Sequence, residues 1–525
     1  MNVDHLATLP RAVQHLARVQ KTQIAYVFEG RETTYGAFGT HTDRVANGLL
    51  AAGLAPGDRI AYLGKNCDHY FELLIGAAKA GVVITPISWR LAAPEVEYIA
   101  AHCDAALLFV GNESVELAQS IASQLPALRG VVAMEDAVVD WPAYQDWRDG
   151  QATTPPTHVS RPDDVVLQLY TSGTTGRPKG AMLTHRNLTV SAIIAERENI
   201  AWLRWVPDDV SLVAMPVAHI GGTGWGLRGL LAGAKGIVVR DFDPRRVLDF
   251  IANDRISKLF LVPSAIQIVL RDPRARQVNY SRLRYLIYGS APMPADLLRE
   301  GMEVFGCGFV QTYGMTETTG SVTGLMPEDH ASGNTALLRA AGRALPWAEV
   351  AVVDAAGKHV PPGEVGEVIV RSLQTMAGYW KQPEETARAI DADGWLRTGD
   401  AGYMDADDYL YIHDRVKDMI ISGGENVYPA EVENAIYGHP HVAEVAVIGV
   451  PDARWGEAVK AIVVPRDGAT PDARDILQWA RERLAGFKLP KSIDFVDALP
   501  RNPSGKVLRR QLREPYWQGY TRRVN

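Results

Sequence analysis

The stretch VVLQLYTSGTTGRPKG (165–180) decides the fold class. Its first six residues are mainly apolar, as in a buried strand, and they open into a loop rich in glycine and hydroxyl side chains. Working outward, short apolar runs alternate with helical patterns through the first 400 residues, for example an apolar run within 58–64, a helix over 70–80 and an apolar run within 81–87. This alternation predicts an α/β protein with parallel sheets.

The chain of 525 residues is too long for one ordinary domain. From about Gly342 the pattern changes to short strand-like pieces broken by turn signals, which predicts a small barrel or distorted sheet. Near Asp414 it changes again, to a tail that alternates strand and helix by itself. We therefore predict a large N-terminal domain of stacked α/β sheets plus a small barrel (1–414), and a small α+β C-terminal domain (415–525).

Composition restricts the class of protein. Hydrophobic residues make up 47% and charged residues 22%, as in soluble globular proteins, and the net charge of −7 argues against a nucleic-acid-binding surface. No apolar run is long enough for a membrane span, and the N-terminus predicts an amphipathic helix. Cys67, Cys103 and Cys307 lack metal-type spacing. These features predict a cytoplasmic protein.

The loop after the strand at 165–170 has the composition of a phosphate-binding site. Glycines let backbone N–H groups approach an anion, hydroxyls donate further hydrogen bonds, and Lys179 supplies a positive charge. It is not a Walker A loop, because Gly180 follows Lys179, and the next helix should begin near His185, outside the loop. The candidate phosphate ligands are Thr171, Ser172, Gly173, Thr174, Thr175, Gly176 and Lys179.

A second glycine motif offers an alternative. Residues 224–229 read GWGLRG, which fits G-x-G-x-x-G and follows the strand-like VSLVAMP. A dinucleotide fold needs a tight turn between strand and helix, whereas the run at 216–223 intervenes here. A non-catalytic or dinucleotide-binding protein therefore remains the alternative of a different class.

Several further segments, in order, resemble those of one enzyme family. They are MPVAHIGGTG (215–224), IYGSAP (287–292), QTYGMTE (311–317), RTGD (397–400), HDRVKDMIISGGENVYPAEVE (413–433) and PRNPSGKVLRR (500–510). Together with YTSGTTGRPKG (170–180) they resemble the acyl-adenylate-forming superfamily of acyl-CoA synthetases, luciferases and peptide-synthetase adenylation domains. The resemblance spans nearly the whole chain and is closest to fatty-acid or aryl-acid CoA ligases.

The resemblance implies two half-reactions: an acid and ATP form acyl-AMP and pyrophosphate, and a thiol then displaces AMP. It places Lys506 at the acid carboxylate and a bridging phosphate oxygen, and Glu317 with Thr171 at Mg²⁺. Lys506, Lys179, His219 and Glu317 are the candidate catalytic residues. The remaining ATP- and AMP-binding candidates are Ser290, Ala291, Pro292, Gln311, Thr312, Tyr313, Gly314, Met315, Thr316, Asp400, Ile412 and Arg415.

Within that set, the resemblance gives Tyr313 to adenine stacking, the 290–292 segment to the opposite wall, and Asp400 with Arg415 to the ribose hydroxyls. Without the family, each of these residues has an ordinary structural role. The acid pocket is predicted from His219, Gly224, Trp225, Gly289 and Thr312, with His219 positioning substrate rather than acting as a base.

The pocket sequence favours an apolar acid. Neither HIGGTGWG nor IYGSAP contains a basic residue, and Arg228 is the nearest cation, which disfavours dicarboxylates. Trp225 and the β-branched Thr312, which stands where many relatives have glycine, are expected to shorten or reshape the pocket. We expect medium- or long-chain fatty acids or aromatic acids.

The second half-reaction is expected to use a swing of a mobile C-terminal domain about a hinge at Lys417. By resemblance, Ser422, Gly423 and Gly424 line the pantetheine tunnel, and Trp455 lies on the CoA side. The expected substrates and cofactors are ATP, Mg²⁺, coenzyme A and a carboxylic acid, with a homodimer considered beside a monomer. Within the superfamily the alternative is a standalone adenylating enzyme that passes the acyl group to a carrier protein.

Overall fold

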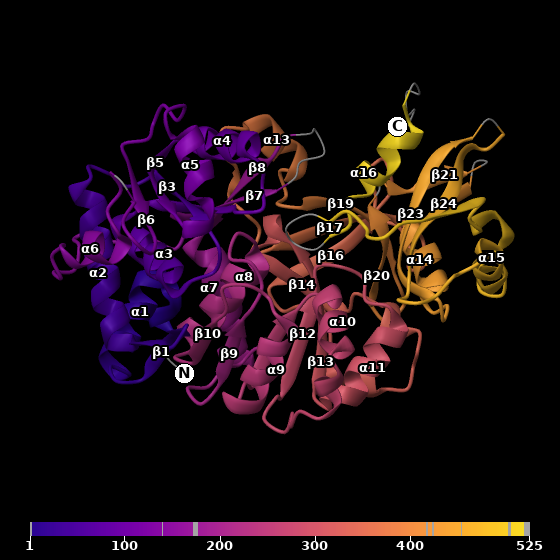
Figure 1. Ribbon diagram of the computed structural model, residues 1–525, viewed down its shortest axis with the longest axis horizontal. Helices are drawn as coiled ribbons and strands as arrows, with labels where there is room; N and C mark the ends of the chain where they lie inside the picture. Colours follow the sequence, from indigo (N-terminus) through magenta and orange to yellow (C-terminus); the bar gives the residue numbers. More distant parts are fainter. Residues whose placement is uncertain are drawn as a thin grey trace.

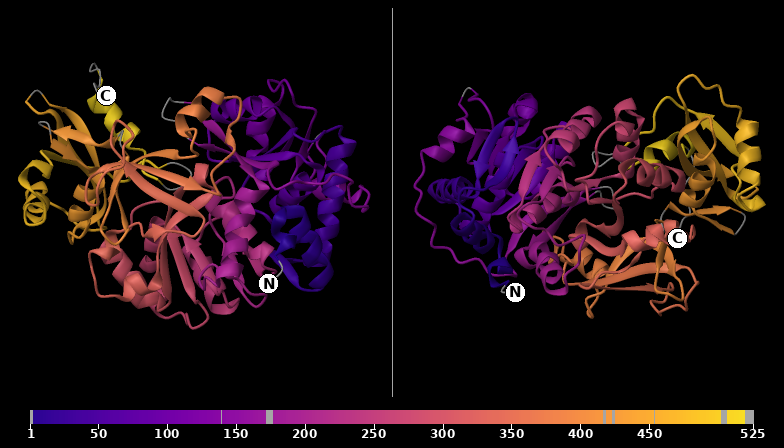
Figure 2. Two further views of the ribbon diagram at one scale, coloured as in Figure 1. Left: turned by 180° about the vertical axis from the view of Figure 1, so that it is seen from behind. Right: turned by 90° about the horizontal axis from the view of Figure 1, so that it is seen from below.

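The computed structural model describes residues 3–138, 140–171, 177–415, 418–422, 425–452, 454–501 and 506–518, with only the backbone of Asp414, Arg415 and Asn426. Two large sheets and a smaller one form the N-terminal body, and the C-terminal elements β21–β25 and α14–α16 lie at one end of the molecule, opposite α1–α6 (Figures 1 and 2). No helix of the described chain is long and apolar enough to span a bilayer.

A mainly parallel sheet carries the first of the predicted motifs. Its order is β18-β8-β7-β4-β3-β5-β6, and β3 and β5 are buried at every residue, as expected for strands covered on both faces. Its strands are β3 Arg59–Gly64, β4 Val83–Ser88, β5 Ala105–Val110, β6 Gly130–Ala133, β7 Val165–Thr171, β8 Lys179–Thr184 and β18 Gly378–Tyr379.

The second sheet holds most of the other motifs. Its order is β15-β14-β13-β12-β11-β9-β10-β1-β2, with parallel pairing from β13 through β12, β11, β9 and β10 to β1. The strands are β1 Ile24–Phe28, β2 Arg31–Thr34, β9 Val210–Val213, β10 Lys235–Val238, β11 Lys258–Leu261, β12 Tyr285–Gly289, β13 Gly308–Met315, β14 Gly320–Leu325 and β15 Arg343–Ala344.

Two smaller sheets complete the fold. The region predicted as a small barrel is an open, curled antiparallel sheet in the order β16-β17-β19-β20, a half-barrel. Its strands are β16 Ala348–Val353, β17 Gly366–Ser372, β19 Leu396–Met404 and β20 Leu410–Arg415. The C-terminal sheet contains β21 Ile420–Ser422, β22 Glu425–Val427, β23 Val442–Asp452, β24 Gly456–Pro465 and β25 Ser492–Phe495.

Helices cover these sheets, and local capping fixes several of their ends. Thr184 accepts a hydrogen bond from Asn187 N, so α7 begins at His185, as predicted, and α3 spans the predicted 70–80 helix. The helices are α1 Leu9–Val19, α2 Tyr35–Ala51, α3 Asp68–Ala80, α4 Ala93–His102, α5 Val115–Ala122, α6 Tyr144–Asp149, α7 His185–Glu198, α8 Ile220–Leu231, α9 Pro244–Asn253, α10 Pro263–Arg271, α11 Ala295–Phe305, α12 Pro327–Ala331, α13 Pro383–Ala389, α14 Pro429–Tyr437, α15 Ala473–Arg481 and α16 Arg509–Arg513.

Separate hydrophobic clusters stabilise the two parts of the chain. One large cluster joins α1–α3 to the strands and helices of the nine-stranded sheet, whereas the C-terminal sheet packs α14 and α15 around residues such as Ile420, Val432 and Ile476. Polar contacts cross between the parts, for example Gln267 Nε2 to Tyr437 Oη and to the carbonyl oxygen of Ala443. The predicted mixed α/β architecture is confirmed.

Candidate active site

The strand β7 and the strand β8 bring Thr171 and Lys179 opposite each other, as antiparallel register partners. Both are the ends of the predicted phosphate loop, whose residues Ser172, Gly173, Thr174, Thr175 and Gly176 lie outside the described chain. Thr171 Oγ1 donates a hydrogen bond to Glu317 Oε1 over 3.1 Å. The structure therefore joins the loop to the QTYGMTE segment, as the resemblance implied.

Glu317 is the centre of this end of the site. It lies in the short 3₁₀ helix Thr316–Thr318 after β13, and its side chain is buried. Tyr379 Oη donates to the same Oε1 atom over 2.9 Å, and Met376 N donates to the Glu317 carbonyl oxygen over 2.8 Å. Two donors therefore fix one carboxylate oxygen of Glu317.

Lys179 meets the same group of residues from the other side. Its Nζ forms an ion pair with Glu385 of α13 and lies 5.2 Å from the centre of the Tyr379 ring. The hydrogen bond from Lys179 lowers the pKa of the Glu385 carboxyl; desolvation opposes this decrease, and the Lys179 and Arg388 charges add to it. Lys179 is thus a buried cation held beside the proposed phosphate position.

The donor set fits a magnesium ion. Mg²⁺ takes oxygen ligands, and it is commonly bound through one or two protein oxygens together with substrate phosphates. The Glu317 carboxylate and the Thr171 hydroxyl lie in contact next to the predicted phosphate loop. Among the described residues there is no cluster of three or more carboxylates, histidines and cysteines, so a site of this kind would depend on the nucleotide for its other ligands.

The proposed nucleotide wall is formed by β12, β13 and β19. Tyr313 Oη donates a hydrogen bond to Asp400 Oδ2 over 2.7 Å. Asp400 is the register partner of Arg415 across β19 and β20, and Ile412 lies further along β20 as the partner of Gly402. The segment Ser290–Ala291–Pro292 follows the carboxyl end of β12, where ligands bind in open α/β sheets. Ser290 adopts a left-handed φ of 67°, which a non-glycine residue adopts only at a cost.

The rest of the QTYGMTE segment follows along the same wall, in β13 and the 3₁₀ helix. Its residues are Gln311, Thr312, Gly314, Met315 and Thr316. Gly314 is required here, because a Cβ atom would overlap the carbonyl oxygen of Gly320 at the register shift between β13 and β14. The hydrogen bond from Tyr313 to Asp400 therefore links the adenine candidate on β13 to the ribose candidate on β19, in the adjoining sheet.

His219 is the N-cap residue of α8 and faces the proposed acid side. Burial lowers the pKa of His219 to about 4, and the positive charges of Lys506 and Arg90 add to the decrease. Its Nε2 atom is enclosed and forms no hydrogen bond within the described chain. His219 is therefore neutral at physiological pH and has a polar atom to offer a ligand, which agrees with a positioning role rather than a charged one.

Lys506 approaches the site from the C-terminal part. It is exposed, and its charge acts on His219 across the two parts of the chain. The structure therefore brings Lys506 towards His219, whereas residues 502–505 of the PRNPSGK segment lie outside the described chain.

The predicted acid pocket residues lie between α8 and the nine-stranded sheet. Gly289 pairs with Thr312 across β12 and β13, and a Cβ atom at Gly289 would overlap the Thr312 carbonyl oxygen. Trp225 is buried: its Nε1 donates to the Leu212 carbonyl oxygen over 3.1 Å. Gly224 lies one residue before it, on a half-buried face of α8.

The second glycine motif does not form a dinucleotide site. Gly224, Gly226 and Gly229 all lie inside α8, which begins at Ile220, rather than in a turn between a strand and a helix. Gly226 is there for packing, because a Cβ atom would overlap the Phe71 ring. The dinucleotide alternative is therefore wrong.

The CoA-side predictions are only partly described. Ser422 is the buried last residue of β21. Trp455 is 38% exposed in the turn between β23 and β24, where its backbone N donates a hydrogen bond to Asp452 Oδ1 over 2.9 Å. Gly423, Gly424 and the predicted hinge residue Lys417 lie outside the described chain. Their roles remain predictions.

Sequence reasoning missed three residues that the structure places at the site: Tyr379 and Glu385 at the phosphate end, and Arg90 near His219. The first two lie in AGYWKQPEET (377–386), a segment with no phosphate-binding composition. They reach the site because β18 pairs with β8. The only local feature of this segment is the run QPEET (382–386), which is rich in Pro and Glu and does not indicate a phosphate site.

Comparison with known proteins decides the family. A model described as "AMP-binding enzyme" matches residues 13–380, and one described as "AMP-binding enzyme C-terminal domain" matches residues 431–506. The chain belongs to this family.

Full-length relatives of this AMP-binding enzyme are known. It is 41% identical to the fatty acid–[acyl-carrier-protein] ligase ScoC of Streptomyces coeruleorubidus, with 99% of this chain and 98% of the relative covered. It is also 41% identical to a feruloyl-CoA synthase of an Amycolatopsis species, with coverages of 95% and 97%. The ATP-bound crystal structure of MatB from Rhodopseudomonas palustris superposes with a TM-score of 0.88 at 34% identity, with coverages of 98% and 100%.

Proposed function

We propose that this AMP-binding enzyme is an ATP-dependent carboxylate–CoA ligase that activates a medium- or long-chain fatty acid or an aromatic acid. Its general class is that of AMP-forming acid–CoA ligases. The observation that carries the proposal is the presence of two groups of residues at the two ends of the site. Thr171, Glu317 and Lys179 lie at the phosphate end, and at the acid end the charge of Lys506 acts on His219.

The first half-reaction brings an acid carboxylate to a phosphate that is also negative. An oxygen of the acid bonds to the α-phosphorus, and the bond from that phosphorus to the bridging oxygen breaks, so that pyrophosphate leaves. Lys506 offsets the charge repulsion between the carboxylate and the phosphate. His219 is neutral and holds the acid in position without exchanging a proton with it.

Glu317 and Thr171 would hold Mg²⁺, which supplies charge neutralisation at the phosphates when bound. Tyr379 keeps the Glu317 carboxylate oriented through its hydrogen bond, and Lys179 adds a second positive charge beside the departing phosphates. Tyr313 and Asp400 lie on the opposite wall and would hold the adenosine part of the nucleotide.

The second half-reaction forms the thioester. The sulfur of CoA bonds to the acyl carbon, the bond from that carbon to the phosphate oxygen of AMP breaks, and AMP leaves. We place the thiol route along the segment that begins at Ser422, and the change of geometry at Lys417. Both assignments rest on the resemblance.

Transfer to a carrier protein is the second candidate, favoured by the full-length similarity to a fatty acid–[acyl-carrier-protein] ligase. One experiment separates the two. AMP release is measured for a panel of acids with no acceptor, with CoA, and with a phosphopantetheinylated acyl carrier protein, and products are identified by mass. The proposal predicts acid-dependent AMP release that CoA stimulates; stimulation only by the carrier protein would overturn it in favour of the second candidate.

A further inference from the structure

A stripe of partly accessible surface runs along the buried helix α8. Most residues of the helix are buried, whereas Gly221, Gly224 and Arg228, together with the first residue Ile220, keep accessible surface. Their spacing of three and four residues places them on one helix face. A Cβ atom at Gly221 would lie 3.0 Å from the Phe260 ring of β11, so this face is turned towards the nine-stranded sheet. The stripe begins next to His219, the N-cap residue.

Arg228 ends this stripe over the start of β11. Lys258 and Phe260 are two residues apart on β11 and therefore share a face of the sheet. Burial lowers the pKa of Lys258 to about 8 against the opposing effect of Asp209, and the nearby charges of Arg284 and Arg228 contribute to the decrease. Arg228 therefore lies close to Lys258, at the opposite end of α8 from His219.

Arg228 has no counter-ion in the described chain. It forms neither a hydrogen bond nor an ion pair with any residue that the structure describes, and burial alone lowers its pKa to about 10, so that it remains charged at neutral pH. The nearby Asp209 is already occupied: it accepts hydrogen bonds from Ser257 Oγ over 2.7 Å and Val206 N over 3.0 Å, and it pairs with Arg284 and Lys258.

The charges around this end of α8 do not balance. Lys258 and Arg284 already share the buried carboxylate of Asp209, and Arg228 has no ion pair with any residue that the structure describes. A bound anion would supply the counter-ion that Arg228 lacks among the described residues. Arginine also binds carboxylates through two parallel hydrogen bonds, a geometry that a lysine does not provide.

The helix α8 and the strand β12 give the same distance between the acid-activating end and the far end of the pocket. His219 and Arg228 are nine residues apart, or about 13 Å along a helix axis. Gly289 and Tyr285, at the two ends of β12, are four residues apart, which is also about 13 Å. Tyr285 is the register partner of Lys258. The acid-activating end and the unpaired cation therefore lie at opposite ends of one helix and one strand.

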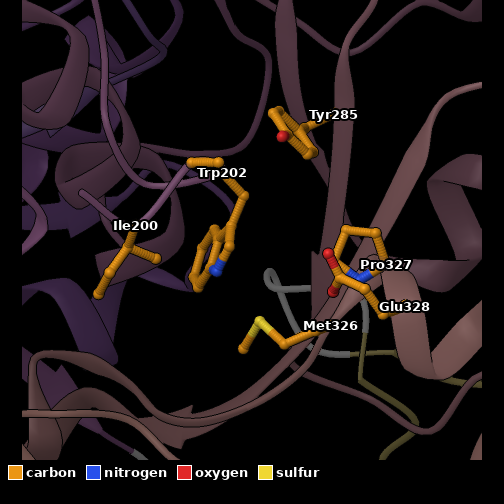
Figure 3. Close-up of a pocket in the computed structure, with 7 residues that line it drawn as sticks. Ile200, Trp202, Tyr285, Met326, Pro327 and Glu328 are labelled. Atoms are coloured by element: carbon orange, nitrogen blue, oxygen red, sulfur yellow. The ribbon is translucent and has the colours of Figure 1, made fainter. Parts of the chain in front are cut away.

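Space exists beyond Lys258. A cavity of about 190 Å³ is lined by Tyr285 together with Trp202, Met326 and Glu328 (Figure 3). The buried Trp202 Nε1 atom forms no hydrogen bond within the described chain. The cavity lies at the amino end of β12, whereas the motif residues gather at its carboxyl end. It is therefore not the nucleotide site, and neither Arg228 nor Lys258 is among the residues that line it.

We propose that Arg228 is a specificity-determining residue that binds a second anionic group at the distal end of the acid, so that the preferred substrates are acids with an apolar body and a carboxylate at each end. This inference rests on the proposed function. It also reverses the expectation, drawn from the sequence near Arg228, that dicarboxylates are disfavoured, because that expectation could not foresee an unpaired cation on the pocket face of α8.

The test compares matched acids of equal length: straight-chain monocarboxylates and α,ω-dicarboxylates of increasing chain length, assayed by acid-dependent AMP release with CoA. The wild-type enzyme is expected to prefer the dicarboxylate at the lengths that reach Arg228, by at least about tenfold in kcat/KM. Arg228→Met should remove that preference and leave or improve activity with the monocarboxylate of the same length. Arg228→Lys should retain part of it.

Arg282→Met, at an exposed arginine, is the matched control and should leave the preference unchanged. A wild-type enzyme that disfavours the dicarboxylate at every length overturns the inference, and so does an Arg228→Met variant with an unchanged ratio. If Arg228→Met does not fold, the wild-type chain-length profile decides alone. Absence of AMP release with every acid would instead contradict the proposed function, so the two failures are distinguishable.

Discussion

The Tyr379 hydroxyl donates a hydrogen bond to Glu317 Oε1 over 2.9 Å, and this contact links two segments that are far apart in the chain. Thr171 donates to the same oxygen, and Lys179 lies over the Tyr379 ring. Tyr379 therefore connects the carboxylate proposed to bind a metal ion with the lysine proposed to meet the phosphates. It touches both without belonging to either motif.

Replacing Tyr379 with Phe should weaken the use of magnesium. The loss of one hydrogen bond leaves the Glu317 carboxylate less well oriented, and outer contacts of this kind typically change metal affinity by about 10- to 100-fold. The measurement is the rate of AMP release over a magnesium titration, in which the half-saturating concentration should rise. Tyr403→Phe, on β19 away from Glu317, serves as control. Superimposable titrations for Tyr379→Phe and the wild type would contradict the assignment.

Lys179→Met should raise KM for ATP by about tenfold and leave KM for the acid nearly unchanged. The reason is that Lys179 lies at the phosphate end, whereas the acid meets His219 and Lys506. Initial rates at varied ATP and acid concentrations measure both constants. Lys381→Met removes an exposed ion pair with Asp104 and should change neither constant. An equal effect on both substrates would place Lys179 elsewhere in the mechanism.

Lys506→Ala and Lys417→Pro should separate the half-reactions. Loss of the Lys506 charge should slow acyl-AMP formation by roughly 100-fold, because a preorganised donor at a reacting oxygen has an effect of that size. Proline at the proposed hinge restricts backbone rotation and should spare acyl-AMP formation while slowing thioester formation.

Pyrophosphate–ATP exchange measures the first step, and thioester formation from added acyl-AMP measures the second. The two-conformation hypothesis fails if both variants lose both steps equally.

His219 should not titrate near neutral pH. Its pKa is lowered to about 4, so it stays neutral while the pH falls from 8 to 5 and becomes protonated only near pH 4. The pH profile of kcat/KM for the acid should therefore show no inflection near 6.5 that depends on His219. His219→Gln should lower kcat/KM without changing the shape of the profile. An inflection near 6.5 that disappears in the variant would show that His219 acts as a titrating base.

Thr312→Ala should widen the acid pocket beside Gly289. The Thr312 side chain is buried, and its Oγ1 would lie 2.9 Å from a Cβ atom at Gly289, so it fills the space next to that glycine. Removing its branch should raise kcat/KM for bulkier ring-bearing acids by about tenfold relative to short straight chains. KM for ATP should not change. A shift in ATP affinity with no change in acid preference would place Thr312 on the nucleotide side alone.

Much of the fold could be predicted from local pattern. Strands such as β3 and β5 are short and mainly apolar, and α7 begins at a Thr-capped boundary, so apolar runs and capping indicate their positions. The half-barrel was harder to predict, because short antiparallel strands with turns give the same pattern whether the sheet closes or stays open. Whether this sheet closes depends on the surroundings of its two outer strands, β16 and β20.

The motif residues are a prediction that the sequence could make, since phosphate binding favours glycine and hydroxyl side chains in one continuous loop. Tyr379 and Glu385 could not be placed at the site in the same way, because their segment, AGYWKQPEET (377–386), does not have the composition of a phosphate-binding loop. Arg228 is the clearest case: beside glycine and leucine it reads as an ordinary helix residue. Only the pairing of β11 with β12, and the packing of α8 on them, shows that it has no counter-ion.

By itself, the amino-acid sequence determined the order of the elements, the phosphate-loop composition and the class of chemistry, because each depends on residues that are adjacent in the chain. Tertiary structure alone decided which side chains meet: Thr171 and Tyr379 on one oxygen of Glu317, and Arg228 beside Lys258. Those meetings depend on the order in which strands pair and on which helix face they cover, and no local pattern carries that information.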